Sequence, residues 1–89
     1  NNLDLAHQHG TLTLARELAT QGAGVLAVLH DPNLASLYAD RVVLLERGRI
    51  QADGPPHEVF RADLIEAVYG MPVSVLPHPS RGCPQIMPA

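Results

Sequence analysis

Residues 25–34 read Val-Leu-Ala-Val-Leu-His-Asp-Pro-Asn-Leu, and this stretch decides the fold class. Its apolar first half, residues 25–29, is typical of a short strand that is covered on both faces, as in a parallel sheet. Asp31 is a good helix N-cap, and Pro32 suits the first helical position, where no backbone N–H is needed. The stretch therefore predicts a buried strand that ends at His30 and a helix that begins directly after it.

Helical and strand patterns continue on both sides of this stretch. Leucines and alanines at helical spacing predict a helix over residues 5–21, with Asp4 as its N-cap and Gly22 as its stop. Downstream, residues 41–46 predict a strand, and Arg47-Gly48 predicts a tight turn into a returning strand over residues 49–52. The alternation of helices and strands predicts an α/β fold with a parallel sheet.

The last third of the chain carries shorter elements. A short helix is expected over residues 54–60, and a second one is expected from Asp63, as its N-cap, to Tyr69, with Gly70 as its stop. Residues 73–75 carry a weak signal for an edge strand. We expect residues 1–76 to form part of one domain and residues 77–89 to form a proline-rich, extended or loosely packed tail. Two parallel strands alone would leave their edges unpaired, so this piece is expected to need the rest of its domain for stability.

Composition excludes several classes of function. The formal net charge is −3, and all six cations are arginines scattered along the chain, so the basic stripe of a nucleic-acid binder is absent. The longest aliphatic run, residues 25–29, is far shorter than the ~20 residues that span a bilayer. Any membrane association is therefore expected to depend on a partner protein. Because the first residue is Asn rather than Met, we expect the chain to be the C-terminal part of a longer protein.

His30 is the strongest candidate for a functional side chain. Ligands of open α/β sheets bind outside the carboxyl ends of the strands, where an imidazole can hydrogen-bond a phosphate oxygen. A histidine at such a junction can also be purely structural, and its position alone leaves both interpretations open. His7 and His9 lie two residues apart on a predicted helix and cannot easily share a metal ion, while His57 and His78 have no ligands near them in sequence. No metal site is predicted, and the single cysteine has no second thiol to pair with.

Asn1-Asn2-Leu3-Asp4 and, at a suitable separation, His30-Asp31 with Asn33-Leu34 resemble two motifs of ATP-binding-cassette (ABC) transporter ATPases. Asn1-Asn2-Leu3-Asp4 is similar to the D-loop, which usually reads Ser-Ala-Leu-Asp. His30-Asp31, followed by Asn33-Leu34, resembles the switch-histidine loop, which usually reads His-Asp-Leu-Asn. The strand and hairpin over residues 38–54 match the family as well. The resemblance as a whole runs from residue 1 to about residue 76. Within the family, three segments are similar to haem importers of the iron-chelate uptake group: residues 3–8, 68–70 and 75–79.

The resemblance implies an ATPase subunit that energises haem import across the bacterial inner membrane, bound peripherally at its cytoplasmic face. Two copies would form a homodimer around two ATP molecules and Mg²⁺ and would drive transmembrane permease subunits that receive their cargo from a solute-binding protein. The implied catalytic residues are His30, which would contact the γ-phosphate, and Asp4, which would fix the D-loop beside the histidine loop of the second copy. Asn1, Asn2 and Leu3 would lie at the dimer interface near the nucleotide. Ferric-siderophore and cobalamin importers share much of the pattern and remain alternatives.

Two departures from the family pattern bear on this interpretation. Pro32 stands where Leu usually follows His-Asp, and it is either neutral in the first helical turn or tilts the loop. The phosphate-binding loop needs a lysine, and the chain has none. The Walker A, signature and Walker B motifs all lie outside these residues, so the 89 residues alone are expected to be inactive and to bind ATP only negligibly. Two other interpretations remain. The chain could be a non-catalytic interaction module that keeps the shape of the C-terminal part of the ATPase, or it could belong to the ATPase of an exporter.

Overall fold

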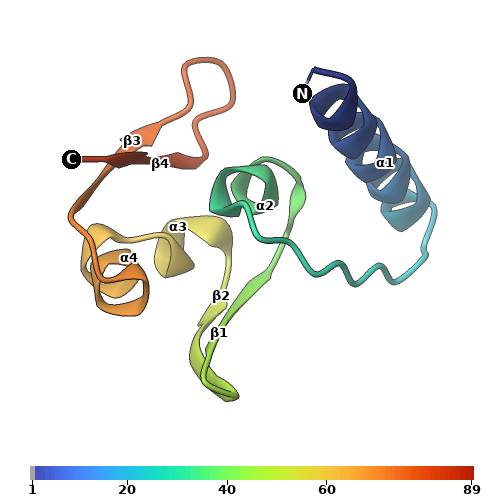
Figure 1. Ribbon diagram of the computed structural model, residues 1–89. Coiled ribbons are helices and arrows are strands. Elements are labelled where there is room, and N and C mark those ends of the chain that lie inside the picture. Colours follow the sequence, from blue (N-terminus) through green and yellow to red (C-terminus); the bar gives the residue numbers. More distant parts are fainter. Residues whose placement is uncertain (1) are drawn as a thin grey trace. The chain divides into compact units, whose positions relative to one another are not determined.

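The computed structural model describes residues 2–89, with side chains described from Leu5 onward. The chain divides into two compact units, Asn1–His30 and Asp31–Ala89. The first unit contains helix α1, Asn2–Thr20, followed by an extended segment (Figure 1). Seven elements make up the second unit: α2 (Pro32–Tyr38), β1 (Val42–Glu46), β2 (Arg49–Gly54), α3 (Pro56–Val59), α4 (Ala62–Tyr69), β3 (Val73–Pro77) and β4 (Pro84–Pro88). None of the helices in residues 2–89 has the length and apolar character needed to cross a bilayer.

Helix α1 ends where the sequence predicts and begins earlier. Gly22 has a φ of +99°, and its N–H donates to the carbonyl of Ala19, while the N–H of Ala23 donates to the carbonyl of Leu18, both at 3.1 Å. This pair of bonds is a Schellman motif, which confirms Gly22 as the stop. The predicted cap is wrong, because α1 begins at Asn2 and Asp4 lies inside the first turn. An acidic residue is favourable before a helix and in its first turn alike, so sequence does not separate the two positions.

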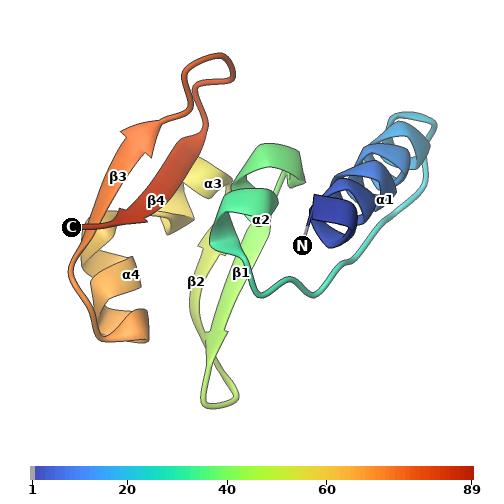
Figure 2. The same ribbon diagram turned by 45° about the horizontal axis from the view of Figure 1, so that its top comes forward.

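Residues 25–29 form no strand, contrary to the prediction. They run as an extended segment between α1 and α2 (Figure 1). The side chains of Leu26 and Val28 are 95% and 87% exposed. A strand is held by hydrogen bonds to a neighbouring strand, and none of the strands within residues 2–89 pairs with this segment. The parallel sheet expected from the α/β pattern is likewise absent from the described residues, whose two sheets are both antiparallel hairpins (Figure 2).

The first hairpin follows the prediction closely. Strands β1 and β2 are joined by Arg47 and Gly48, with φ angles of +52° and +73°. Two successive left-handed residues form the type I′ turn that matches the natural twist of a hairpin. Leu44 pairs with Ala52 but Leu45 pairs with Ile50, so one extra residue of β2 forms a bulge.

An exposed ion pair closes the open end of this hairpin. The Nε of Arg41 lies 2.7 Å from Oδ1 of Asp53, and its second nitrogen lies 3.0 Å from Oδ2. The hydrogen bond from Arg41 lowers the pKa of the Asp53 carboxyl below its usual 3.8; partial desolvation opposes this shift, and the charge of Arg41 adds to it. Because the folded-state pKa is depressed, this stabilisation is present above pH 3.8 and is lost as the pH falls through the lower folded-state value.

Replacing Arg41 with glutamine is expected to raise the pKa of Asp53 back toward 3.8, because both favourable interactions are lost. An NMR titration of the side-chain carboxyl carbon of Asp53 measures this directly. Arg49→Gln on the same hairpin is the matched control and should leave the Asp53 titration unchanged. Equal Asp53 pKa values in the Arg41→Gln variant and the unsubstituted chain would contradict the assignment.

The core of the second unit lies between the two hairpins and the short helices. It consists of Leu44, Val59, Phe60, Ile65 and Val73, which are at most 9% exposed. Helix α4 begins after Arg61, so the predicted N-cap Asp63 is wrong: it lies in the first turn, where a carboxylate is also favourable. The predicted stop is confirmed by Gly70, whose φ of +72° is left-handed.

The proline-rich end of the chain is a strand and packs against the core. β4 pairs with β3 in antiparallel register, with Val73 opposite Pro88 and Val75 opposite Ile86. The edge strand predicted around residues 73–75 is confirmed as β3. The tail was expected to be extended or loosely packed; residues 84–88 are extended, as strand β4, and Ile86 packs against the core cluster. Proline is tolerated here since β4 is an edge strand, whose outer N–H positions need no partner.

Candidate functional site

The loop that carries His30 leads directly into a well-capped helix. Oδ1 of Asp31 accepts a hydrogen bond from the N–H of Asn33 at 2.9 Å, and Pro32 occupies the first helical position of α2. Both predictions for this junction are therefore confirmed. Because Asp31 and Pro32 fix the first turn, the direction in which the chain enters α2 is set immediately after His30.

His30 itself is exposed. Within the described residues, no hydrogen bond or ion pair engages its side chain, so the ring nitrogens are accessible to a ligand. A neutral imidazole has one N–H donor and one acceptor, and the donor suits a phosphate oxygen. The structure thus places an exposed imidazole directly before a capped helix start.

The four residues of the predicted D-loop are placed only in part. Asn1 lies outside the described residues. The backbone of Asn2, Leu3 and Asp4 belongs to the first turn of α1, so these three residues are helical rather than part of a loop before the helix. The role predicted for Asp4 depends on the histidine loop of a second copy and stays a prediction.

Sequence reasoning assigned no role to the side chain of Asn33, which links α2 to the end of the chain. The N–H of Ile86 donates to Oδ1 of Asn33 at 2.6 Å, and Nδ2 of Asn33 donates to the carbonyl of Ile86 at 3.0 Å. One turn later, the hydroxyl of the buried Ser36 donates to the carbonyl of Pro84. Because β4 contributes only backbone groups to these hydrogen bonds, the side chains of residues 84–88 do not predict them.

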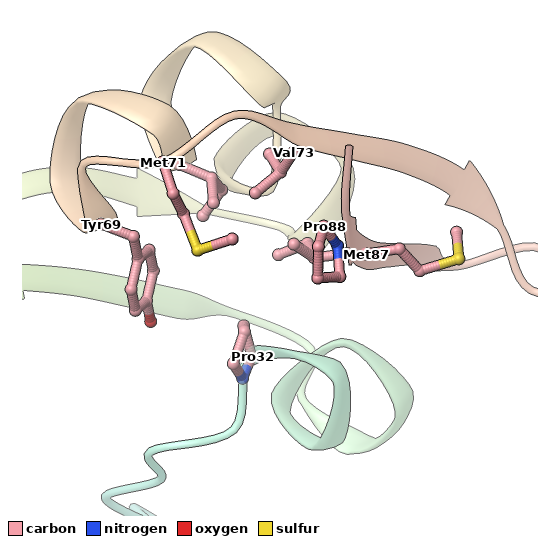
Figure 3. Close-up of a pocket in the computed structure, with 8 residues that line it drawn as sticks. Pro32, Tyr69, Met71, Val73, Met87 and Pro88 are labelled. Carbon is pink, nitrogen blue, oxygen red and sulfur yellow. The ribbon is translucent and has the colours of Figure 1, made fainter.

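A small apolar cavity lies beside the start of α2. It has a volume of about 120 Å³ and is bordered by Pro32 from α2, by residues of α4 and β3, and by β4. Figure 3 shows Pro32 projecting from the helix start toward β4, with Tyr69 and Met71 on the other side of the cavity. Pro32 therefore has apolar neighbours from the hairpin β3–β4. Helix α2 begins at Pro32 and continues to Tyr38.

The remaining chemically active side chains are dispersed. In residues 2–89, no three His, Cys, Asp or Glu side chains come close enough together to hold a metal ion. His57 lies 3.9 Å from the carboxylate of Glu58, its sequence neighbour on α3. Cys83 is partly buried in the loop before β4 and is a free thiol.

The chain is similar over almost its whole length to several proteins named as hemin import ATP-binding proteins. The chain is 55% identical over 85 residues to the hemin import ATP-binding protein HmuV of Photobacterium profundum, which covers 96% of this chain and 31% of that protein. It is 53% identical over 87 residues to HmuV of Aliivibrio fischeri, covering 98% of the chain and 34% of the relative. The protein of the same name from Deinococcus radiodurans is 52% identical over 88 residues, with 99% and 34% coverage. No protein-family model matches the chain.

These matches run through almost the entire chain and include residues 30–34. The matched region is the C-terminal part of the relatives. The chain spans about a third of the length of the curated relatives that it matches. It is therefore a relative of hemin import ATP-binding proteins over the C-terminal third of their sequence.

Proposed function

We propose that the chain is the C-terminal part of the ATP-hydrolysing subunit that energises haem import across the bacterial inner membrane. The observation that carries this proposal is identity of 50–55% across almost the whole chain to proteins named as hemin import ATP-binding proteins. The longer protein of which this chain would be a part is called the full-length subunit below. The 89 residues alone are expected to be inactive, because they contain no lysine for a phosphate-binding loop.

His30 is proposed to donate a hydrogen bond to the γ-phosphate of ATP and to help position the attacking water. Its exposed imidazole and the fixed helix start behind it support this role. ATP and Mg²⁺ would be held mainly by residues outside this chain, and Mg²⁺ would neutralise charge on the transferring phosphoryl group. Catalysis of this kind depends on positioning and electrostatics, so a single well-placed donor can have a large effect.

The D-loop residues Asn1, Asn2, Leu3 and Asp4 are proposed to lie at the interface of two copies of the full-length subunit. Asp4 would hold the geometry of that interface beside the histidine loop of the second copy. The dimer is proposed to act on transmembrane permease subunits from the cytoplasmic face of the membrane, with a solute-binding protein delivering haem.

The proposal is tested with the full-length subunit, co-purified with its permease and reconstituted in liposomes. We expect ATP hydrolysis to be stimulated by the solute-binding protein loaded with hemin. Ferric siderophores and cobalamin, delivered by their own binding proteins, are the matched controls and should leave the rate at its basal value. Stimulation by either control in place of hemin would assign a different cargo, and absence of any ATP hydrolysis would favour a non-catalytic module.

A further inference from the structure

We propose that Asn33 is a positioning residue for the switch-histidine loop, which it holds by tying the start of α2 to the backbone of β4. The inference rests on the proposed function, because it concerns the loop that carries His30. It gives the proline-rich end of the chain a part in ATP turnover that its sequence does not suggest.

Asn33 is held on two sides. Its backbone N–H donates to the side chain of Asp31, the residue next to His30, at 2.9 Å. Its side-chain amide both donates to and accepts from the backbone of Ile86, at 3.0 and 2.6 Å. Two hydrogen bonds to one residue fix the orientation of the amide as well as its position. An unbroken series of short contacts therefore runs from the residue beside His30 to β4.

β4 is itself firmly held. It pairs with β3 along its length, and Ile86 packs against the core cluster of Leu44, Val59, Phe60, Ile65 and Val73. The link through Asn33 thus connects the helix start to the best-packed part of the second unit. Reactive side chains need such a supporting structure, because a displacement of about 1 Å can cost about 100-fold in rate.

The other polar contacts described between α2 and the C-terminal hairpin lie further from His30. Ser36 donates to the carbonyl of Pro84, and the guanidinium of Arg81 lies 5.6 Å from the ring centre of Tyr38. These contacts anchor the middle and the end of α2. Asn33 makes the polar contacts with β4 at the end of the helix that adjoins His30. Asn33 and Ser36 are therefore a matched pair: both bind the backbone of β4, but only Asn33 adjoins the histidine loop.

The test measures steady-state ATP hydrolysis by the full-length subunit with its permease. Asn33→Ala is expected to lower kcat about tenfold and to change the KM for ATP by less than about twofold, since misplacement affects the reacting groups more than nucleotide binding. Asn33→Asp keeps the acceptor for the N–H of Ile86 but loses the donor, so its kcat should fall between those of the alanine variant and the unsubstituted protein. Ser36→Ala should keep kcat within about twofold. Equal losses for Asn33→Ala and Ser36→Ala would overturn the proposal.

A second measurement separates positioning from general loss of structure. In single-turnover experiments, Asn33→Ala is expected to cause no further loss when His30 is already alanine, because there is no imidazole left to position. If the Asn33→Ala loss is the same in both backgrounds, Asn33 acts independently of His30 and the inference is wrong. If His30→Ala alone leaves ATP turnover unchanged, the proposed role of His30 fails instead, and the two failures are thereby distinguished. Should Asn33→Ala not fold, the Asn33→Asp variant carries the same comparison.

Discussion

Replacing His30 with alanine in the full-length subunit is expected to lower kcat for ATP hydrolysis at least about 100-fold, the usual effect of removing one preorganised donor from a transition state. The exposed imidazole follows an extended segment and directly precedes the fixed start of α2. The KM for ATP should change much less, because the residues proposed to bind the nucleotide lie elsewhere. Phosphate release by the reconstituted complex gives both constants.

His57→Ala is the matched control for this experiment. His57 is another exposed histidine, on α3, and its neighbour Glu58 lies 3.9 Å away. It has no part in the proposed chemistry, so its removal should leave kcat unchanged. Equal turnover in His30→Ala and the unsubstituted subunit would rule out the assigned role. A loss in both variants would show that the effect is not specific to the His30 imidazole.

Replacing Phe60 with alanine is expected to destabilise the second unit by about 3–5 kcal/mol, the usual cost of emptying an aromatic site in a core. Phe60 is 2% exposed and belongs to the core cluster that also contains Ile65 and Val73. A domain of this size has a total stability of only about 3–9 kcal/mol, so this single change removes most of it. Urea denaturation followed by far-UV circular dichroism measures the loss.

Leu45→Ala serves as the control, because it also replaces a large apolar side chain of the second unit with a methyl group. Leu45 is 62% exposed on β1, and surface changes of this kind usually alter stability by less than about 0.5 kcal/mol. The contrast between the two variants isolates burial from hydrophobicity. Similar shifts in the two denaturation midpoints would mean that Phe60 is not part of a packed core.

Local signals explain why much of the fold could be predicted from sequence. Gly22 and Gly70 stop helices because each adopts a left-handed backbone that other residues avoid. Asp31-Pro32 starts α2, and Arg47-Gly48 makes the hairpin turn, through interactions within a few residues. Predictions of this kind need no knowledge of distant parts of the chain.

Unlike the misplaced N-caps Asp4 and Asp63, the missing strand at residues 25–29 reflects dependence on remote partners. Residues 25–29 have the composition of a buried strand, but strand pairing requires a neighbour that the described residues do not supply. By contrast, residues 84–88 have the composition of a tail, yet they pair with β3 and form a strand. The composition of a segment limits the secondary structures that it can form, and the neighbouring strands determine whether it forms one.

The candidate site divides along the same line. His30 could be proposed from sequence because its neighbours, from the apolar run to Asp31, form an ordered motif. The link between Asn33 and Ile86 could not, because its partners are 53 residues apart and one of them contributes only backbone atoms. Roles that depend on backbone partners leave no trace in the identity of the partner residue.

The exposed apolar segment before His30 has a consequence for handling the chain in isolation. Residues 24–29 contain no charge and no proline, and two of their side chains are almost fully open to solvent. Short stretches with this character are prone to intermolecular β-pairing and aggregation when nothing covers them. Purified alone, the chain should therefore lose solubility with rising concentration, and a charged substitution such as Leu26→Glu should restore it.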